Sequence, residues 1–456
     1  MCWGAVAVVG FGLMLFSSIA SRGPAAPAPW SGARMYVGAG EPTRETEGLE
    51  YVKVPIRFLP MTPLAEVLAQ AVGGKGAEGE GAGVERSFRI ASQEKLILYP
   101  GLRDDFTRTM LASGRFPMPG KDEVVAGAYA TQEDQLAVGG RTFTVVGVLR
   151  EQVLLFLDSY LIAGDSAQAD LFSPDDEAVQ IAYVVRPSTG EELDRDTKKL
   201  LSEAFPSGEF VLQIGRARTH AAQFWAFVSG QALLLLGGSF LLTALYVSLA
   251  SRLRPGFIRT PLAEIQKRKR LFLALHLVYF GAVVLFTVLV HRVPELQHFL
   301  QVLVRAELKE GPLALVTRAY ASKNVVWAAL VTLGINFTLG SLAFITLPSL
   351  IVPGIGALLA FFRAAAWGLV LAPTNPLLLR GMVPHSLVLF LEGSGYVLAA
   401  FFALLVPIYL FSRKQGERVV VRYGRALLMN VRGNLLVLIV LAVAALYEAL
   451  EVILQS

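Results

Sequence analysis

The sequence contains several long runs of apolar residues, separated by segments of ordinary polarity. An α-helix rises about 1.5 Å per residue, so about 20 apolar residues cross the hydrocarbon core of a bilayer. Pro348 and the Pro/Gly segment 353–356 would divide the longest run into two helices. The runs predict about seven transmembrane helices, at residues 4–20, 223–248, 271–289, two within 324–372, 387–411 and 435–454.

Residues 4–20 are open to two interpretations. Ser18 and Ala20 fit the small-residue cleavage site of a signal peptide. However, no basic segment precedes the run, and the alternation of inside and outside loops described below requires a helix here. We therefore favour a retained first helix, followed by a domain at 21–221, a second helix at 222–250, a basic loop at 251–270 and a five-helix bundle at 271–456.

The domain at 21–221 begins with a Pro/Ala/Gly-rich linker at 21–35 and continues with short elements of mixed type. A glycine-rich flexible loop is expected at 73–83. Helices are predicted at 64–72, 104–113 and 191–204, and strands at 51–58, 87–92, 95–99, 123–126, 141–149, 178–185 and 209–213. The fold class predicted is thus a multi-pass α-helical membrane protein with an α+β domain between its first two helices.

Charge is distributed unevenly along the chain. Only 17% of the residues are charged and the mean hydropathy is +0.53, values that exclude a single soluble domain. Residues 21–221 hold 21 Lys and Arg against 28 Asp and Glu, a net charge of −7, and residues 222–456 hold 20 against 8, a net charge of +12. Because the excess bases flank apolar runs, they indicate contact with a lipid bilayer and argue against nucleic-acid binding.

Two basic segments fix the predicted orientation. Of the 20 bases in the second half, 13 lie in 251–270 and 412–434. The positive-inside rule places both segments in the cytoplasm. The chain would then be a protein of the bacterial inner membrane, with a cytoplasmic N-terminus and the domain at 21–221 outside.

The sequence offers little for catalysis or cofactors. The single cysteine and five histidines have no zinc-site spacing, so we expect no metal and no cofactor. Residues 114–122 (GRFPMPGKD) lack the spacing and the Ser or Thr of a phosphate-binding loop, so the chain carries no ATPase of its own. Ser394 has only His385 as a base on its own helix, about 13 Å along the axis. We predict that the protein is not an enzyme.

Ionisable and polar side chains within the predicted spans are the first group of candidate functional residues, because they are costly in lipid. Arg363 could pair with Glu392 or with Glu448, and residue depth favours Glu392. Such a pair either specifies helix packing alone or belongs to a polar path that contacts a substrate. The candidates are Arg363, Glu392, Glu448, His276, Asn336 and His385.

The basic segments supply the second group. They either contact lipid headgroups and set the topology, or one of them contains a short helix that docks a cytoplasmic ATPase. Residues 261–269 are the best such helix, with Thr260 as its cap. Residues 292–322 include an amphipathic stretch expected to lie along the outer membrane surface. The docking candidates are Arg259, Glu264, Lys267, Arg268, Arg418, Arg422 and Arg425.

The first half of the chain resembles a known family. The matching residues are Gly114-Arg115-Phe116, DEVVAG at 122–127, LAVG at 136–139 and FTVVGV at 143–148. In this order they resemble the periplasmic core domain of MacB-type mechanotransmission transporters. Residues 158–172 and the predicted helix at 191–204 fit the second lobe of that domain. The resemblance covers roughly residues 1–250, including both flanking helices.

The second half, from about residue 265, resembles the stage II sporulation protein M (SpoIIM) family of integral membrane proteins. At the family pattern P-H-G-x-x-E this chain has Pro384-His385, with Ser386 and Leu389 at the glycine and acid positions and Glu392 three residues later. The other matching residues are Lys323-Asn324, the turn at 353–356, Gly393, Gly395 and ALYE at 445–448.

Together the two resemblances imply a permease-like membrane subunit of an ABC-type transport or mechanotransmission complex. A separate cytoplasmic ATPase would drive it, an envelope protein could bind the outer domain, and the assembly is expected to be oligomeric. The alternative function is a scaffold that transports nothing and recruits cell-envelope remodelling proteins through its outer domain.

Overall fold

The computed structural model divides the chain into two compact units. One is a helical bundle of Met1–Ser21, Thr219–Val293 and Leu303–Ser456, and the other is a sheet domain of Arg22–Arg218 with Pro294–Val302. The structure describes residues 2–20, 33–38, 40–73, 85–86, 88–90, 93–127, 130, 134–150, 156, 158–164, 169–188, 195–205, 209–210, 221–309, 313–374, 376–412 and 418–455.

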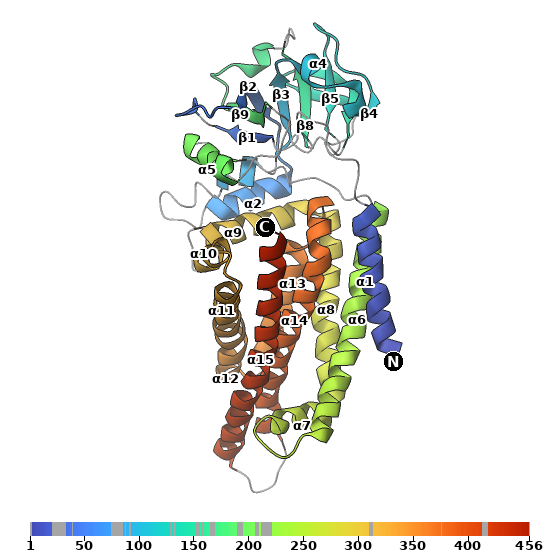
Figure 1. Ribbon diagram of the computed structural model, residues 1–456, viewed down its shortest axis with the longest axis vertical. Coiled ribbons are helices and arrows are strands. Elements are labelled where there is room, and N and C mark those ends of the chain that lie inside the picture. The colour runs from blue at the N-terminus through green and yellow to red at the C-terminus, as the bar shows by residue number, and fades with distance from the viewer. Residues whose placement is uncertain are drawn as a thin grey trace. The chain divides into compact units, whose positions relative to one another are not determined.

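The sheet domain is built on one mixed sheet with the strand order β10-β1-β9-β2-β3-β8-β5-β7-β4, and β6 pairs with β7 (Figure 1). The pairs β3–β8 and β5–β7 are parallel and the others are antiparallel. Its strands are β1 (Arg34–Val37), β2 (Leu49–Phe58), β3 (Lys95–Tyr99), β4 (Leu111–Gly114), β5 (Glu123–Ala126), β6 (Gln135–Val138), β7 (Arg141–Leu149), β8 (Ser159–Ala163), β9 (Val179–Pro187) and β10 (Glu209–Phe210).

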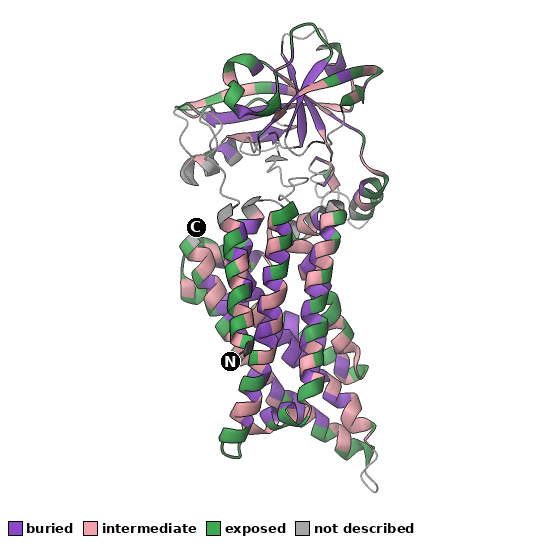
Figure 2. Cartoon of the chain, turned by 90° about the vertical axis from the view of Figure 1, so that its right-hand side faces the viewer, coloured by how far each residue is buried: buried purple, intermediate pink, exposed green. Residues whose placement is uncertain are grey.

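The central strands β3 and β8 are buried on both faces, and Figure 2 shows buried residues along the strands in the middle of the sheet. Along β3, Leu96 belongs to one apolar cluster and Ile97 to the other, because successive side chains of a strand point to opposite faces. The short helical elements of the domain are α2 (Pro63–Gly73), α4 (Leu102–Asp105), η1 (Arg108–Met110), η3 (Ala169–Phe172) and α5 (Arg195–Ala204).

Two of the predicted elements of this domain are wrong. The helix expected at 104–113 ends at Asp105 as part of α4, because Leu111 pairs with Leu149 of β7 and starts strand β4. Residues 88–90, expected in a strand, are helical. The sequence also missed β1, which begins inside the predicted linker, and the strands β6 and β8. The predicted loop at 73–83 and the end of the strand at 209–213 lie largely outside the described residues.

The bundle has five helices that are long and apolar enough to cross a membrane, among the residues that the structure describes. The apolar helices at predicted spans one and five are shorter, at Trp3–Ser18 and Ile355–Val370, so the count of about seven spans is not confirmed. The helices are α1 (Cys2–Ala20), α6 (Ala221–Arg252), α7 (Arg259–Lys267), α8 (Lys269–Arg292), α9 (Pro294–Lys309), α10 (Ala314–Ala321), α11 (Val325–Ile335), η4 (Asn336–Thr346), α12 (Leu347–Ile351), α13 (Ile355–Val370), α14 (Pro376–Leu410) and α15 (Val419–Gln455).

Helix α14 is the central helix of the bundle. In its apolar stretch 78% of the residues are buried, against 33–39% in the other four long helices. Those four present large exposed apolar side chains, such as Val326, Leu285 and Val443, which is what a lipid-facing surface requires. Glu392, which lies in this stretch, is therefore enclosed by other helices.

The turn between α12 and α13 lies where the Pro/Gly segment predicted it, but Pro348 does not break the helix. Pro348 lies within α12, directly after the π-helical segment η4. The helix ends at Ile351, and Gly354 takes a φ of 97° as α13 begins. Only this left-handed position, which glycine adopts without strain, reverses the chain.

Helices α1 and α6 pack with their backbones in close approach. A Cβ at Gly230 would lie 2.6 Å from the carbonyl oxygen of Gly10, and a Cβ at Gly237 would lie 2.7 Å from that of Trp3. The Trp3 ring also stacks on Phe240, with centroids 3.9 Å apart. Small residues at such positions allow the close helix contact that association in lipid depends on.

Candidate functional site

Arg363 of α13 and two side chains of α14 form a hydrogen-bonded group inside the bundle. Nη2 of Arg363 donates to the Tyr396 hydroxyl at 2.6 Å and lies 3.5 Å from Oε1 of Glu392. The Tyr396 hydroxyl donates in turn to Oε1 of Glu392 at 2.6 Å. Of the two acids that the sequence left open as partners of Arg363, the structure brings Glu392 to it.

Several contacts offset the cost of holding these charges in an apolar bundle. Glu392 is 4% exposed and Tyr396 is fully buried, so each needs its hydrogen bonds. The guanidinium of Arg363 lies 4.0 Å from the centroid of the Tyr396 ring and 5.4 Å from that of Trp367. These aromatic faces attract a cation most strongly where water is excluded.

Glycines make the room that this group occupies. A Cβ at Gly340 would lie 2.8 Å from the Tyr396 hydroxyl oxygen, and a Cβ at Gly393 would lie 2.9 Å from the ring of Tyr279. Gly340 lies in η4, and π-helical segments are frequent at functional sites. Gly393 is among the residues that carry the second resemblance, but the tyrosines and Gly340 were missed. The spacing of Glu392 and Tyr396, one turn apart, was the available signal.

A second ionisable group lies on α14 and α15, in the first turns of α14 and the last turns of α15. Nδ1 of His385 is 3.6 Å from Oε2 of Glu451. Glu448, one turn before Glu451, interacts electrostatically with His385, Glu451 and Glu392. Two of the predicted candidates, His385 and Glu448, thus belong to one group together with Glu451.

The other two intramembrane candidates have different surroundings. His276 of α8 is fully buried, its Nδ1 lies 3.0 Å from the carbonyl oxygen of Phe272, and its ring packs edge-on against the Phe272 ring. Asn336 is half-buried at the junction of α11 and η4. Among the described residues, neither side chain forms a hydrogen bond or an ion pair with the Arg363 group.

The two basic segments come together at one end of the bundle, which we call the basic end: α7, the end of α14 and the start of α15. The Arg432 guanidinium lies 5.5 Å from the ring centroid of Phe257, and that of Arg268 lies 5.7 Å from the ring centroid of Tyr409. The first pair joins residues 251–270 to α15, and the second joins them to the end of α14.

Several docking candidates hold the basic end together. Nη1 of Arg422 donates to the carbonyl oxygens of Leu410 and Ser412 at 2.8 and 2.6 Å, where α14 ends. Arg259 donates to the carbonyl of Ala250 at 3.2 Å. Arg268 and Glu264 form an ion pair one turn apart. Lysine or arginine at a helix C-terminus satisfies carbonyls that have no partner within the helix.

Three docking candidates remain exposed: Lys267, Arg418 and Arg425. The predicted docking helix is α7, which begins at Arg259 rather than at Pro261. Thr260 is not its cap, because its hydroxyl donates to the Gly256 carbonyl at 3.0 Å. Ile258 precedes the first turn and has no capping side chain.

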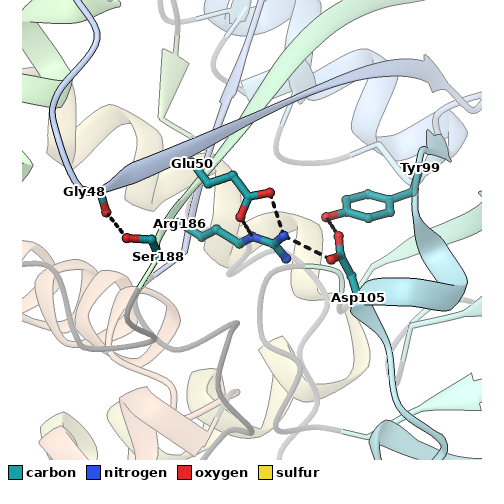
Figure 3. A network of polar contacts seen from close by, with 6 residues as sticks. All are labelled: Gly48, Glu50, Tyr99, Asp105, Arg186 and Ser188. Atoms are coloured by element: carbon teal, nitrogen blue, oxygen red, sulfur yellow. Dashed lines mark hydrogen bonds and ion pairs between the residues drawn. The ribbon is translucent and has the colours of Figure 1, made fainter.

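In the sheet domain, Arg186 of β9 is the centre of a polar network (Figure 3). It donates to both carboxylate oxygens of Glu50, at 2.8 and 2.9 Å, and to Asp105 at 3.0 Å. Tyr99 donates to the other oxygen of Asp105 at 2.9 Å. Arg186 lowers the pKa of Glu50, and burial raises the pKa of Tyr99. The network fixes α4 against the sheet.

A second clamp involves the sequence motif at residues 114–127. Arg115 donates to both oxygens of Glu123 at 2.6 Å, and the backbone N–H of Met118 donates to Glu123 at 2.9 Å. The hydrogen bonds from Arg115 lower the pKa of Glu123 to about 2. Gly114, at a φ of 77°, lets the chain pass close to β7. These motif residues hold the fold of the domain.

Within the described part of the chain, no group of three or more His, Cys, Asp or Glu side chains is placed to hold a metal ion. No protein-family model matches the sequence, and no curated protein or solved structure matches it. The site is therefore interpreted from its own geometry.

Proposed function

We propose that the protein is a permease-like membrane subunit of an ABC-type transport or mechanotransmission complex, driven by a separate ATPase that docks at the basic end. The observation that carries the proposal is the arrangement of α7. Pro261, Leu262 and Ile265 of this short helix are buried in the bundle. Ala263, Gln266 and Lys267 on its opposite face are exposed.

Exposed apolar side chains next to α7 extend this face. Phe257 and Ile258 are 49% and 42% exposed, beside exposed bases on the same loop. In the proposed orientation this surface faces the cytoplasm, away from lipid tails. Exposed aromatic and basic residues together are typical of a protein-binding surface.

The connection of α7 to the sheet domain supports transmission of a movement. Helix α7 follows α6 directly and packs on it. The close glycine contacts join α6 to α1, and the sheet domain is attached to this pair at both ends, after Ala20 and before Ala221. A displacement of α7 would thus act on the two helices that carry the domain.

Co-purification tests the proposal. The full-length protein is cross-linked mildly in its native membrane, purified and analysed by mass spectrometry. We expect to recover a nucleotide-binding subunit with the wild-type protein. The double variant Gln266→Glu, Lys267→Glu should lose this subunit, because it makes the exposed face of α7 negatively charged. Arg318→Glu is the matched control, at an exposed position of α10, which packs beside the C-terminal end of α15.

Equal recovery of the ATPase with both variants would refute docking at α7. If envelope proteins alone are recovered, and the Gln266→Glu, Lys267→Glu variant still retains them, the scaffold function is favoured instead.

A further inference from the structure

The second ionisable group of the bundle has more acids than cations. Glu448 and Glu451 of α15 face a single imidazole, His385 of α14. Arg363 does not correct this balance, because it lies with Glu392, its own counter-ion. Even with His385 charged, two carboxylates and one imidazolium would leave one net negative charge among apolar helices.

Glu451 shows the same excess at the level of atoms. Its side chain is 7% exposed, and its Oε2 has no hydrogen-bond partner among the described residues. That oxygen points to the His385 ring at 3.6 Å, beyond hydrogen-bond length. A buried carboxylate oxygen without a donor is costly, whereas a carboxylic acid carries its own donor.

Among the described residues, the titratable neighbours of this group include Glu392, Tyr320 and Tyr447, the last of which interacts with Glu451. Glu448 interacts with Glu392, His385, Glu451 and Tyr320, and His385 interacts with Glu448, Glu451 and Glu392. Tyr320 of α10 lies 3.1 Å from the Thr332 hydroxyl of α11. None of these neighbours supplies a further positive charge.

We propose that His385, Glu448 and Glu451 form a proton-binding site, in which one proton charges the imidazole and a second is shared by the two carboxyl groups. The site exchanges these protons with water at the end of the bundle where α14 begins and α15 ends. His385 is 22% exposed there, and Glu451 is four residues from the last described residue of α15. The proposal does not depend on ATPase docking.

A hydrophobic carbodiimide tests the site in the wild-type protein, because this reagent adds only to a protonated carboxyl group and reaches groups inside apolar helices. Trypsin cleavage after Arg380, Arg413 and Arg432 separates the acids. The 381–413 peptide contains only Glu392, and the 433–456 peptide contains only Glu448 and Glu451 as side-chain acids. The full-length protein is labelled in phosphatidylcholine–phosphatidylglycerol nanodiscs between about pH 5 and about pH 9.

We expect labelling of the 433–456 peptide that falls about tenfold per pH unit as the shared proton is lost. The 381–413 peptide should stay unlabelled in the wild type and become labelled in Arg363→Met, because Glu392 then loses its counter-ion. The double variant Glu448→Gln, Glu451→Gln should abolish labelling of the 433–456 peptide. The wild-type protein alone can overturn the proposal. It does so if its 433–456 peptide is not labelled at any pH, or if the labelling does not change with pH.

Discussion

The phenol of Tyr396 occupies the space that Gly340 leaves by having no side chain. A Cβ at Gly340 would lie 2.8 Å from the Tyr396 hydroxyl oxygen and 3.0 Å from a carbon of its ring. That hydroxyl joins Arg363 to Glu392. One glycine in the π-helical segment therefore decides whether the charged group can form.

Gly340→Ala should destabilise the bundle. Its methyl group would displace Tyr396 from both charged partners, and overpacking of this kind costs about 1–3 kcal/mol. Gly334→Ala is the control on the same span, because a Cβ there meets nothing within 4 Å. Thermal unfolding in detergent should show a lower midpoint for Gly340→Ala only. Equal midpoints would contradict the packing described here.

Gly230→Leu should separate α1 from α6. The side chain would meet the backbone of Gly10, which cannot move away without shifting the helix. We expect a loss of about 1–3 kcal/mol or more. Gly12→Leu on the exposed side of α1 should leave the unfolding midpoint unchanged, because nothing lies within 4 Å of its Cβ. A reversed order of the two midpoints would show that α1 packs by another face.

Arg422→Met should destabilise the basic end, although Arg422 is one of the docking candidates. Its two hydrogen bonds satisfy carbonyls where α14 ends, and a hydrogen bond to a charged group contributes about 1.5–3 kcal/mol. Arg418→Met, at an exposed position, should change stability by less than about 0.5 kcal/mol. Thermal unfolding of the two variants checks this, and an unaffected Arg422→Met protein would return Arg422 to the docking candidates.

Glu123→Gln should lower the stability of the sheet domain in a pH-dependent way. Arg115 lowers the pKa of Glu123 from 4.5 to about 2, so the folded state binds the proton less readily than the unfolded state. The stabilisation is complete above about pH 4.5 and is lost as the pH falls towards about 2. The midpoint difference between wild type and variant should therefore be largest at neutral pH and shrink on acidification.

Asp170→Asn serves as the control for Glu123, because its pair with Arg141 is exposed at 3.4 Å and contributes little. A Glu123→Gln protein whose midpoint difference stayed constant down to the lowest pH would contradict the Arg115 clamp.

Local patterns predicted much of the sheet domain and the placement of the long helices. Strands β2, β3, β5, β7 and β9 were recognised from runs rich in apolar and β-branched residues, and Gly139-Gly140 supplies the turn before β7. The helix expected at 104–113 was wrong because Leu111 pairs with Leu149, a partner 38 residues away. Such pairing overrides local propensity, and no window of sequence contains it.

The candidate site was likewise predicted only in part from the sequence. Apolar runs made Arg363, Glu392 and Glu448 conspicuous, because any charge within them is costly. The runs could not show that α14 is enclosed or that Tyr396 bridges Arg363 and Glu392. They also could not separate Arg422, which caps a helix, from Lys267, which is exposed.

The sequence by itself determined that the chain carries apolar helices, a mixed α+β domain between the first two of them, and two segments that hold 13 of the 20 bases in its second half. These properties follow from the order of residue types along the chain. The tertiary structure decided which charges meet, which glycines admit a neighbour, and which acids lack a counter-ion. Those properties depend on distances between helices that are far apart in sequence, and only the packed bundle fixes them.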